Sequence, residues 1–214
     1  IGGGWSISQY EMQDFRNRAT VIGVNESMLL QPVQIGITMD RLWAENRIEA
    51  LRQTFERAAV MRMEPSPRSV WFRKGTRKNI PRNPQTHHRE HEFFCDHKSS
   101  YMVLRDSTEM RLNGTNSGMC GINLAIQFDC THIYLLGFDM QKGPNGEPYY
   151  HEPYSWAPEG ATTKGKFKEW APQFREIAQR AIELGISIVN VNHRSAIKNF
   201  ATCSYDSFLK ALNK

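Results

Sequence analysis

The sequence predicts an α/β fold, with a Rossmann-like, mostly parallel sheet flanked by helices and an irregular lid region. Three observations predict it. Short β-rich runs alternate with helical patterns, one run is continuously apolar as in buried parallel strands, and a glycine-rich turn stands at residues 2–4. Strands separated by helices imply crossover connections and therefore parallel neighbours. The 214 residues suit a single domain over 1–214.

The first half of the chain is expected to contain three strands and one helix. The strands are the β-rich runs 20–24, 34–39 and 69–73. Residues 41–60 place apolar side chains near helical spacing, which predicts a helix. Residues 74–100 are too polar and too rich in proline for regular structure, and a loop of this length is typical of a lid or a binding loop.

The second half alternates more regularly. We expect a buried helix over 117–128, a central strand over 132–138, a second lid loop over 141–165, a helix from Pro172 to Gly185, a strand over 186–191 and a terminal helix over 205–212.

Composition limits the class of protein. Hydrophobic residues make up 40% of the chain and charged residues 23%, which is enough to build a core. No apolar run is long enough to span a membrane. The four cysteines lack disulfide or zinc-ribbon spacing, and Cys120 and Cys130 lie in apolar segments as buried thiols would, so we expect a reducing, cytoplasmic setting.

The formal net charge is +5, and the excess of basic residues is concentrated between Arg62 and Lys98. Such a stretch is typical of a solvated loop, or of a surface for phosphates, nucleic acid or another anionic partner.

Polar residues at the carboxyl ends of strands predict the binding site, because ligands of parallel sheets bind beyond those ends. Asn25 follows the first strand, Asp40 follows the second and Asp139 follows the central strand. The turn at Gly3 and Gly4, with Ser6, would add backbone amides that can approach a phosphate closely.

A second small-residue turn opens the helix at 117. Asn116, Ser117 and Gly118 offer an amide, a hydroxyl and unpaired helix N–H groups, which suit a phosphate and equally suit plain helix capping.

Candidate catalytic residues lie in the second lid loop. Tyr149, Tyr150 and His151 could reach a cleft mouth. A tyrosine hydroxyl can donate a hydrogen bond to a departing phosphate, and histidine is the side chain that exchanges protons near neutral pH. A structured loop in which these aromatic side chains shield the edge of the sheet is the alternative.

A cluster of histidines and a cysteine stands in the first lid loop, at His87, His88, His91, Cys95 and His97. It matches no zinc-site spacing, so we interpret it as a basic loop and expect no metal there.

Three segments carry a resemblance to a known family. Residues 1–7 (IGGGWSI), the helix start at 116–118 followed by residues 133–139 (IYLLGFD), and residues 195–200 (SAIKNF) occur in order. Together they resemble the bacterial sialyltransferases of glycosyltransferase family 42, and a related Rossmann-like group that includes the 6-hydroxymethylpterin diphosphokinases. Trp5 stands where the family turn has proline, and Asp40 where it has asparagine.

The resemblance implies a metal-independent glycosyltransferase that uses a nucleotide-activated sugar. It implies Gly3, Gly4, Ser6, Asn25, Asn116 and Ser117 as donor contacts, tyrosines that stabilise the leaving phosphate, and His151 as the base. A glycan or another hydroxyl compound would be the acceptor, and the basic stretch allows an anionic one such as nucleic acid, as in a phage-encoded enzyme. An oligomer is compatible with this scheme.

Two alternatives stay open. One is a diphosphokinase or nucleotide-phosphate transferase that holds Mg²⁺ through Asp40 and Asp139, because polyphosphate charge must be neutralised in transfer. The other is a non-catalytic protein that binds a nucleotide or nucleic acid.

Overall fold

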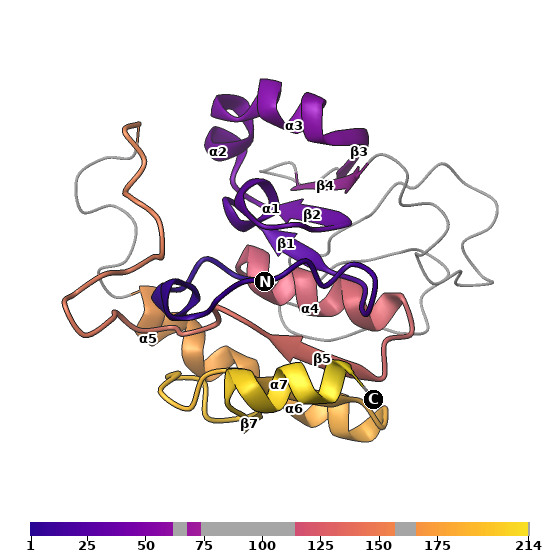
Figure 1. Ribbon diagram of the computed structural model, residues 1–214, viewed down its shortest axis with the longest axis vertical. Coiled ribbons are helices and arrows are strands. Elements are labelled where there is room, and N and C mark those ends of the chain that lie inside the picture. The colour runs from indigo at the N-terminus through magenta and orange to yellow at the C-terminus, as the bar shows by residue number, and fades with distance from the viewer. Residues whose placement is uncertain (62–67, 74–113, 157–165, 214) are drawn as a thin grey trace. The chain divides into compact units, whose positions relative to one another are not determined.

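The computed structural model describes residues 1–61, 68–73, 114–156 and 166–213 (Figure 1). The chain divides into two compact units. The first unit comprises Ile1–Met12 with His132–Lys214, and the second comprises Gln13–Thr131. Both contain helices and small sheets, so the chain is mixed α/β. The single domain over 1–214 and the lid role of residues 74–100 and 141–165 stay predictions; residues 74–100 and 157–165 lie outside the described residues.

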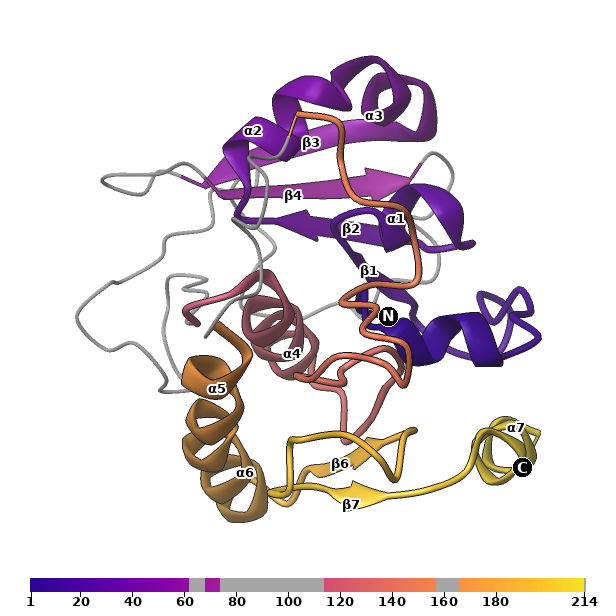
Figure 2. The ribbon, with the colours of Figure 1, turned by 90° about the vertical axis from the view of Figure 1, so that its left-hand side faces the viewer.

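The second unit is built on a four-stranded sheet with the strand order β1-β2-β4-β3 (Figure 2). β1 (Ile22–Val24) runs parallel to β2 (Ile35–Thr38), whereas β4 (Arg68–Arg73) runs antiparallel to both β2 and β3 (Phe55–Met61). The described helices of this unit are α1 (Ser27–Leu30), α2 (Arg41–Asn46), α3 (Ile48–Thr54) and α4 (Ser117–Gln127). The expectation of mostly parallel pairing is therefore wrong for this sheet, because β4 runs against both of its neighbours.

The single helix expected over 41–60 is also wrong. The helical turns break at Arg47, whose guanidinium donates to the Glu26 carboxylate at 2.7 Å, and helix ends at Thr54. The following residues pair with β4 as strand β3. Apolar spacing alone fits a helix here, but it carries no information about a partner strand that competes for the backbone.

Each face of the β1–β2 pair packs against a helix, and the packing on one face explains why both strands carry a glycine. Gly23 lies opposite Gly36, and a Cβ on either would come within 2.7 Å of a Met28 atom of α1. Helix α1 therefore packs closely on this face because neither strand carries a side chain there. The other face places apolar side chains against α4, in a core made of Val24, Ile35, Ile37, Cys120, Leu124 and Phe128. Cys120 is buried as expected, and Cys130 is half-buried at the edge of this core.

The first unit contains a parallel sheet in the order β5-β6-β7, which confirms the parallel expectation for this part of the chain. Its strands are β5 (His132–Leu135), β6 (Ser187–Asn190) and β7 (Ala201–Thr202). Its helices are η1 (Trp5–Gln9), α5 (Lys166–Trp170), η4 (Ala171–Gln173), α6 (Phe174–Glu183) and α7 (Tyr205–Leu212). Figure 2 shows α5 and α6 following one another end to end.

Helix α6 buries one face in the core of the first unit. Phe174 is fully buried and meets Phe138 and Phe200 edge to face, with ring centroids 6.4 and 6.0 Å apart. Pro172 lies one short turn before α6, in η4, and Gly185 follows its end with φ +67°. Glycine ends a helix in this left-handed conformation without the steric cost that a side chain adds.

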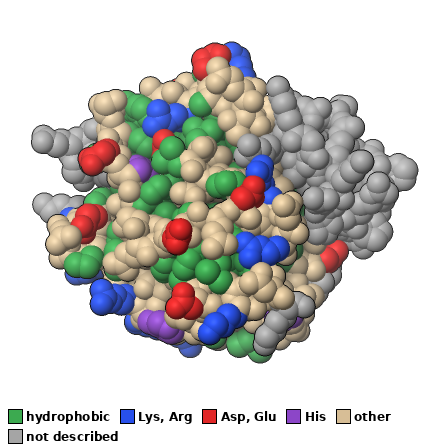
Figure 3. All heavy atoms as spheres, in the orientation of Figure 1, with side chains coloured by type: hydrophobic (Ala, Val, Ile, Leu, Met, Phe, Trp, Pro, Cys, Tyr) green, Lys and Arg blue, Asp and Glu red, His purple; other side chains and the backbone are tan. Residues whose placement is uncertain are grey.

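Charged side chains are scattered singly over the face drawn in Figure 3, with no gathered basic patch among its described residues. Most of the basic stretch between Arg62 and Lys98 lies outside the described residues. A surface for an anionic partner on this stretch stays a prediction.

Candidate functional site

The glycine-rich turn is packed against the end of β5. Gly2 N–H donates to the Leu136 carbonyl at 2.7 Å, and Gly4 N–H donates to the Gly137 carbonyl at 2.9 Å. A Cβ on Gly4 would lie 2.4 Å from a carboxylate oxygen of Asp139 and 2.6 Å from the Gly137 carbonyl oxygen. This close approach requires glycine at position 4. The Gly4 N–H is already hydrogen-bonded within the first unit.

Asp139 is buried, with 1% of its surface exposed, and its carboxylate accepts several hydrogen bonds at this turn. One carboxylate oxygen accepts the Ser6 backbone N–H at 2.8 Å, and the other accepts the Ser6 hydroxyl at 2.7 Å and the Asn192 side-chain amide at 2.8 Å. Burial raises the pKa of Asp139, and the hydrogen bonds from Ser6 and Asn192 oppose that rise. The structure thus brings the predicted residues Ser6 and Asp139 together, bonded to each other.

The predicted catalytic residues also come together. The His151 ring stacks on Tyr149 with centroids 5.1 Å apart, meets Tyr150 edge to face at 5.2 Å, and stacks on Tyr154 at 4.9 Å. We call these four residues the His151 cluster. It adjoins the glycine turn, because Tyr150 N–H donates to the Gly3 carbonyl at 3.3 Å and a Cβ on Gly3 would lie 4.0 Å from His151 Nε2.

The hydrogen bonds of His151 select one tautomer of its neutral imidazole ring. Nδ1 lies 2.8 Å from the Glu152 backbone carbonyl oxygen. A carbonyl oxygen only accepts hydrogen bonds, so Nδ1 carries the proton in the neutral ring and Nε2 keeps its lone pair. Nε2 lies 3.3 Å from the Tyr154 hydroxyl, which donates to it. The half-buried His151 ring is therefore oriented to accept a proton at Nε2.

The remaining predicted binding residues gather in the second unit, around the N-terminus of α4 and the ends of β1 and β2. The Ser117 hydroxyl accepts the Met39 N–H at 2.9 Å, which ties α4 to the end of β2. Asn116 caps α4 by accepting the Met119 N–H at 3.0 Å, and Gly118 lies in the first turn of the helix.

Asn25 and Asp40 take different local roles. Asp40 caps α2 by accepting the Trp43 N–H at 2.9 Å. Asn25 has a left-handed backbone (φ 54°) and donates its N–H to the Ile37 carbonyl at 3.1 Å. Among the described residues, Asn25 Oδ1 and Asn116 Nδ2 are buried without a hydrogen-bond partner. They leave one acceptor and one donor for a ligand, since buried polar atoms are normally paired.

Two groups of residues were weighed as metal ligands: a histidine-rich cluster, interpreted as a basic loop without a metal, and the Mg²⁺ pair of the diphosphokinase alternative. The cluster at His87, His88, His91, Cys95 and His97 lies outside the described residues. Within 1–61, 68–73, 114–156 and 166–213, no three His, Cys, Asp or Glu side chains group as metal ligands would. The Mg²⁺ alternative names Asp40, which belongs to the second unit, and Asp139, which belongs to the first unit and whose oxygens accept three hydrogen bonds.

Sequence reasoning did not select two residues that the structure places in these sites. Tyr154 contacts His151, and it stands in the same aromatic loop as the selected tyrosines, so its spacing could have pointed to it. Asn192 binds Asp139 and follows β6, where the rule on strand ends could have found it.

In the described part of the chain, no helix combines the length and the hydropathy of a membrane span. No family model matches the chain, and comparison with curated proteins and with solved structures finds no significant match.

Proposed function

We propose that this protein is a transferase of Rossmann-like architecture that moves a sugar from a nucleotide-activated donor to a hydroxyl acceptor. The observation that carries the proposal is the geometry of His151. The Glu152 carbonyl holds the proton on Nδ1, so Nε2 is the proton acceptor. General base catalysis needs such an oriented acceptor within reach of the hydroxyl that it deprotonates.

His151 Nε2 takes the proton of the acceptor hydroxyl while that oxygen forms a bond to the anomeric carbon of the donor sugar. The bond between this carbon and the phosphate oxygen breaks, and the nucleotide leaves with the electron pair. Tyr149 and Tyr150 contact the histidine ring and are the tyrosines whose hydroxyl groups would donate to the departing phosphate.

Binding of the nucleotide is supported by the polar atoms of the second unit. Asn25 Oδ1 and Asn116 Nδ2 are an acceptor and a donor among the buried polar atoms that have no hydrogen-bond partner in the described part of the chain. A ribose hydroxyl or a base edge offers the complementary groups. Ser117 fixes the start of α4 against β2, and this rigid support is what a binding residue such as Asn116 requires.

The test compares donors and then variants. The full chain is incubated with CMP-, UDP- and GDP-linked sugars, and separately with ATP and Mg²⁺, while nucleotide release and thermal stability are measured. We expect a nucleotide sugar to stabilise the protein and to be cleaved without ATP. Stabilisation by ATP with Mg²⁺ alone would favour the diphosphokinase alternative, and salt-sensitive DNA binding without any nucleotide effect would favour the non-catalytic one.

The variant His151→Gln should lower donor cleavage and transfer by about 100-fold, the usual lower range for loss of a general base. His193→Gln is the matched control. His193 belongs to the same unit, is exposed, and bonds the Thr202 hydroxyl through Nδ1 at 2.8 Å. Equal activity of the wild type and His151→Gln would remove His151 as the base.

A further inference from the structure

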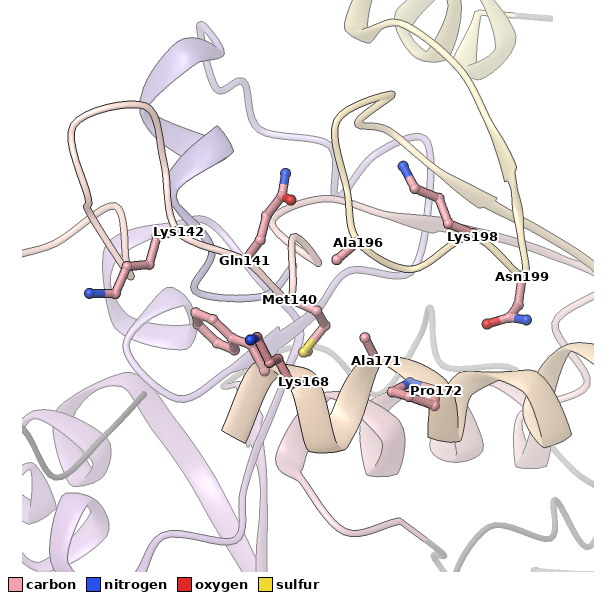
Figure 4. A pocket seen from close by; sticks show the side chains of 10 residues that line it. Met140, Gln141, Lys142, Lys168, Ala171, Pro172, Ala196, Lys198 and Asn199 are labelled. Carbon is pink, nitrogen blue, oxygen red and sulfur yellow. The ribbon is translucent and has the colours of Figure 1, made fainter. Parts of the chain in front are cut away.

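The first unit contains a pocket of about 570 Å³ that none of the predicted site residues lines (Figure 4). Three segments build it: the loop after β5, the α5–η4 helical stretch, and the segment between β6 and β7. Its volume lies in the range typical of pockets for small ligands.

Three lysines, one from each segment, give the pocket its charge. They are Lys142, Lys168 and Lys198, all of them exposed, and in Figure 4 the Lys142 side chain extends away from the other labelled side chains. None of the ten described lining residues carries a carboxylate, and the nearest acidic neighbour in α5, Glu169, is bonded to Lys166 at 2.9 Å. Lysines that line the pocket without a carboxylate partner among the described residues favour an anionic ligand.

The rest of the lining is mainly apolar. Met140, Phe167, Ala171, Pro172 and Ala196 form the surface between the lysines. A free inorganic anion would gain nothing from such a surface, whereas a ring or a hydrocarbon chain would be desolvated on it. The pocket therefore favours a molecule that has both an anionic group and an apolar body.

Hydrogen bonds between the walls hold the pocket in shape. Ala196 N–H donates to the Asp139 carbonyl at 2.8 Å, and the Ser195 hydroxyl donates to the Phe138 carbonyl at 2.7 Å. The Gln141 side-chain amide donates to the Arg194 carbonyl. These bonds join the loop after β5 to the segment before β7, so those two walls exist before any ligand binds. Because these walls are already ordered, binding a ligand costs less conformational entropy.

We propose that this pocket binds a small phosphate-bearing molecule with an aromatic or apolar body. A phosphate monoester, with close to two negative charges, matches three lysines better than a carboxylate, which carries one. The inference rests on the pocket alone and holds whether or not His151 is a base.

Calorimetric titration of the full chain tests it with three small probes: phenyl phosphate, benzoate and inorganic phosphate. Phenyl phosphate should bind more tightly than either of the others, because it alone combines a ring with a dianion. ADP should compete with it. Equal affinity for phenyl phosphate and inorganic phosphate, or no measurable binding of phenyl phosphate, would overturn the proposal.

Variants locate the binding. Lys168→Met and Lys198→Met keep the aliphatic stem and remove the charge, and each should weaken phenyl phosphate binding about tenfold. Lys210→Met, an exposed lysine of α7 outside the pocket, should leave it unchanged. Ala171→Glu, which sets a carboxylate among the lysines, should abolish binding, and far-UV circular dichroism checks that each variant is folded.

If Lys168→Met and Lys210→Met lost the same affinity for phenyl phosphate, the effect would come from the net charge of the protein. That result would overturn the pocket assignment. Displacement of phenyl phosphate by a single-stranded oligonucleotide at lower concentration than ADP would also overturn it, in favour of a nucleic-acid surface. Because failure here leaves donor cleavage by His151 untouched, the two proposals fail separately.

Discussion

Asp139 binds Ser6 across 133 positions of the chain, through the Ser6 backbone N–H on one carboxylate oxygen and the Ser6 hydroxyl on the other. This pair fixes the glycine-rich turn against the end of β5. The same turn carries Gly3, whose carbonyl accepts the Tyr150 N–H next to His151. The buried carboxylate therefore supports the segment on which the candidate catalytic histidine rests.

Replacing Asp139 by asparagine should destabilise the first unit by about 1–3 kcal/mol, the cost of leaving a buried hydrogen-bonding group unsatisfied. Asparagine keeps the shape but turns an amide NH₂ toward one of the Ser6 or Asn192 donors. The measurement is the free energy of urea unfolding. Glu11→Gln is the control, because Glu11 is an exposed carboxylate of the same unit. Equal stability of both variants would contradict the buried role of Asp139.

The pH dependence of stability should carry the signature of Asp139. Burial raises its pKa in the folded protein above the ordinary value of the unfolded chain, near 3.9. The folded state then holds the proton more tightly, so the stability due to this group is fully present below the unfolded pKa and falls as pH rises through the folded pKa.

The stability advantage of the wild type over Asp139→Asn should accordingly shrink as the pH rises above about 4. Urea unfolding of both proteins in this pH range gives the difference directly, and other titrating groups cancel in it. An advantage that grows with pH would mean that the Ser6 and Asn192 hydrogen bonds outweigh burial.

Replacement of the neighbouring glycines Gly3 and Gly4 by alanine should change the stability of the protein to different extents. A Cβ on Gly4 would come 2.4 Å from an Asp139 oxygen, whereas the nearest atom to a Cβ on Gly3 is His151 Nε2 at 4.0 Å. We expect Gly4→Ala to lower the free energy of unfolding by about 1–3 kcal/mol through overpacking, and Gly3→Ala to change it little. Thermal unfolding of the two variants side by side checks this. A larger loss in Gly3→Ala would contradict the packing described.

Local signals predicted the elements whose ends are fixed locally. The helix expected over 205–212 is α7, which Ser204 caps by accepting the Ser207 N–H. The helix expected from residue 117 is α4, capped by Asn116. Elements decided by distant partners were missed. Strand β3 was taken for helix because its pairing with β4 cannot be read from apolar spacing.

The same distinction between local signals and distant partners applies to the candidate site. Tyr149, Tyr150 and His151 are adjacent in the chain, so their residue types alone identified them as candidates. Asp139 was expected to face a ligand, yet its partners Ser6 and Asn192 lie far away in sequence and occupy both of its oxygens. The lysine pocket joins three separate segments, and single lysines in a basic chain carry no signal of such a meeting.

The glycine pair of β1 and β2 gives a prediction for the second unit. A Cβ on Gly36 would meet the flexible end of Met28, its sulfur, at 2.5 Å, whereas a Cβ on Gly23 would meet the Met28 backbone Cα at 2.7 Å. Gly23→Ala should therefore cost more stability than Gly36→Ala. Adding Met28→Ala should relieve the clash in Gly36→Ala and leave that in Gly23→Ala.

Double-mutant cycles on unfolding free energies measure the two couplings. We expect a favourable coupling of about 1 kcal/mol for Gly36→Ala with Met28→Ala, and none for Gly23→Ala with Met28→Ala. Equal couplings would contradict the placement of the Met28 side chain over Gly36.

The neutral imidazole of His151 should adopt a single tautomer. Because Nδ1 donates to the Glu152 carbonyl at 2.8 Å, the neutral ring should carry its proton on Nδ1 and not on Nε2. Long-range proton–nitrogen NMR correlation distinguishes the two forms, and the His151→Gln variant assigns the signal. Tyr154→Phe removes the hydroxyl that lies 3.3 Å from Nε2 but keeps an aromatic ring at the same position, so the Nδ1–H form should persist. A neutral ring protonated on Nε2 would leave no lone pair at the atom nearest the glycine turn, and His151 could not serve there as the base.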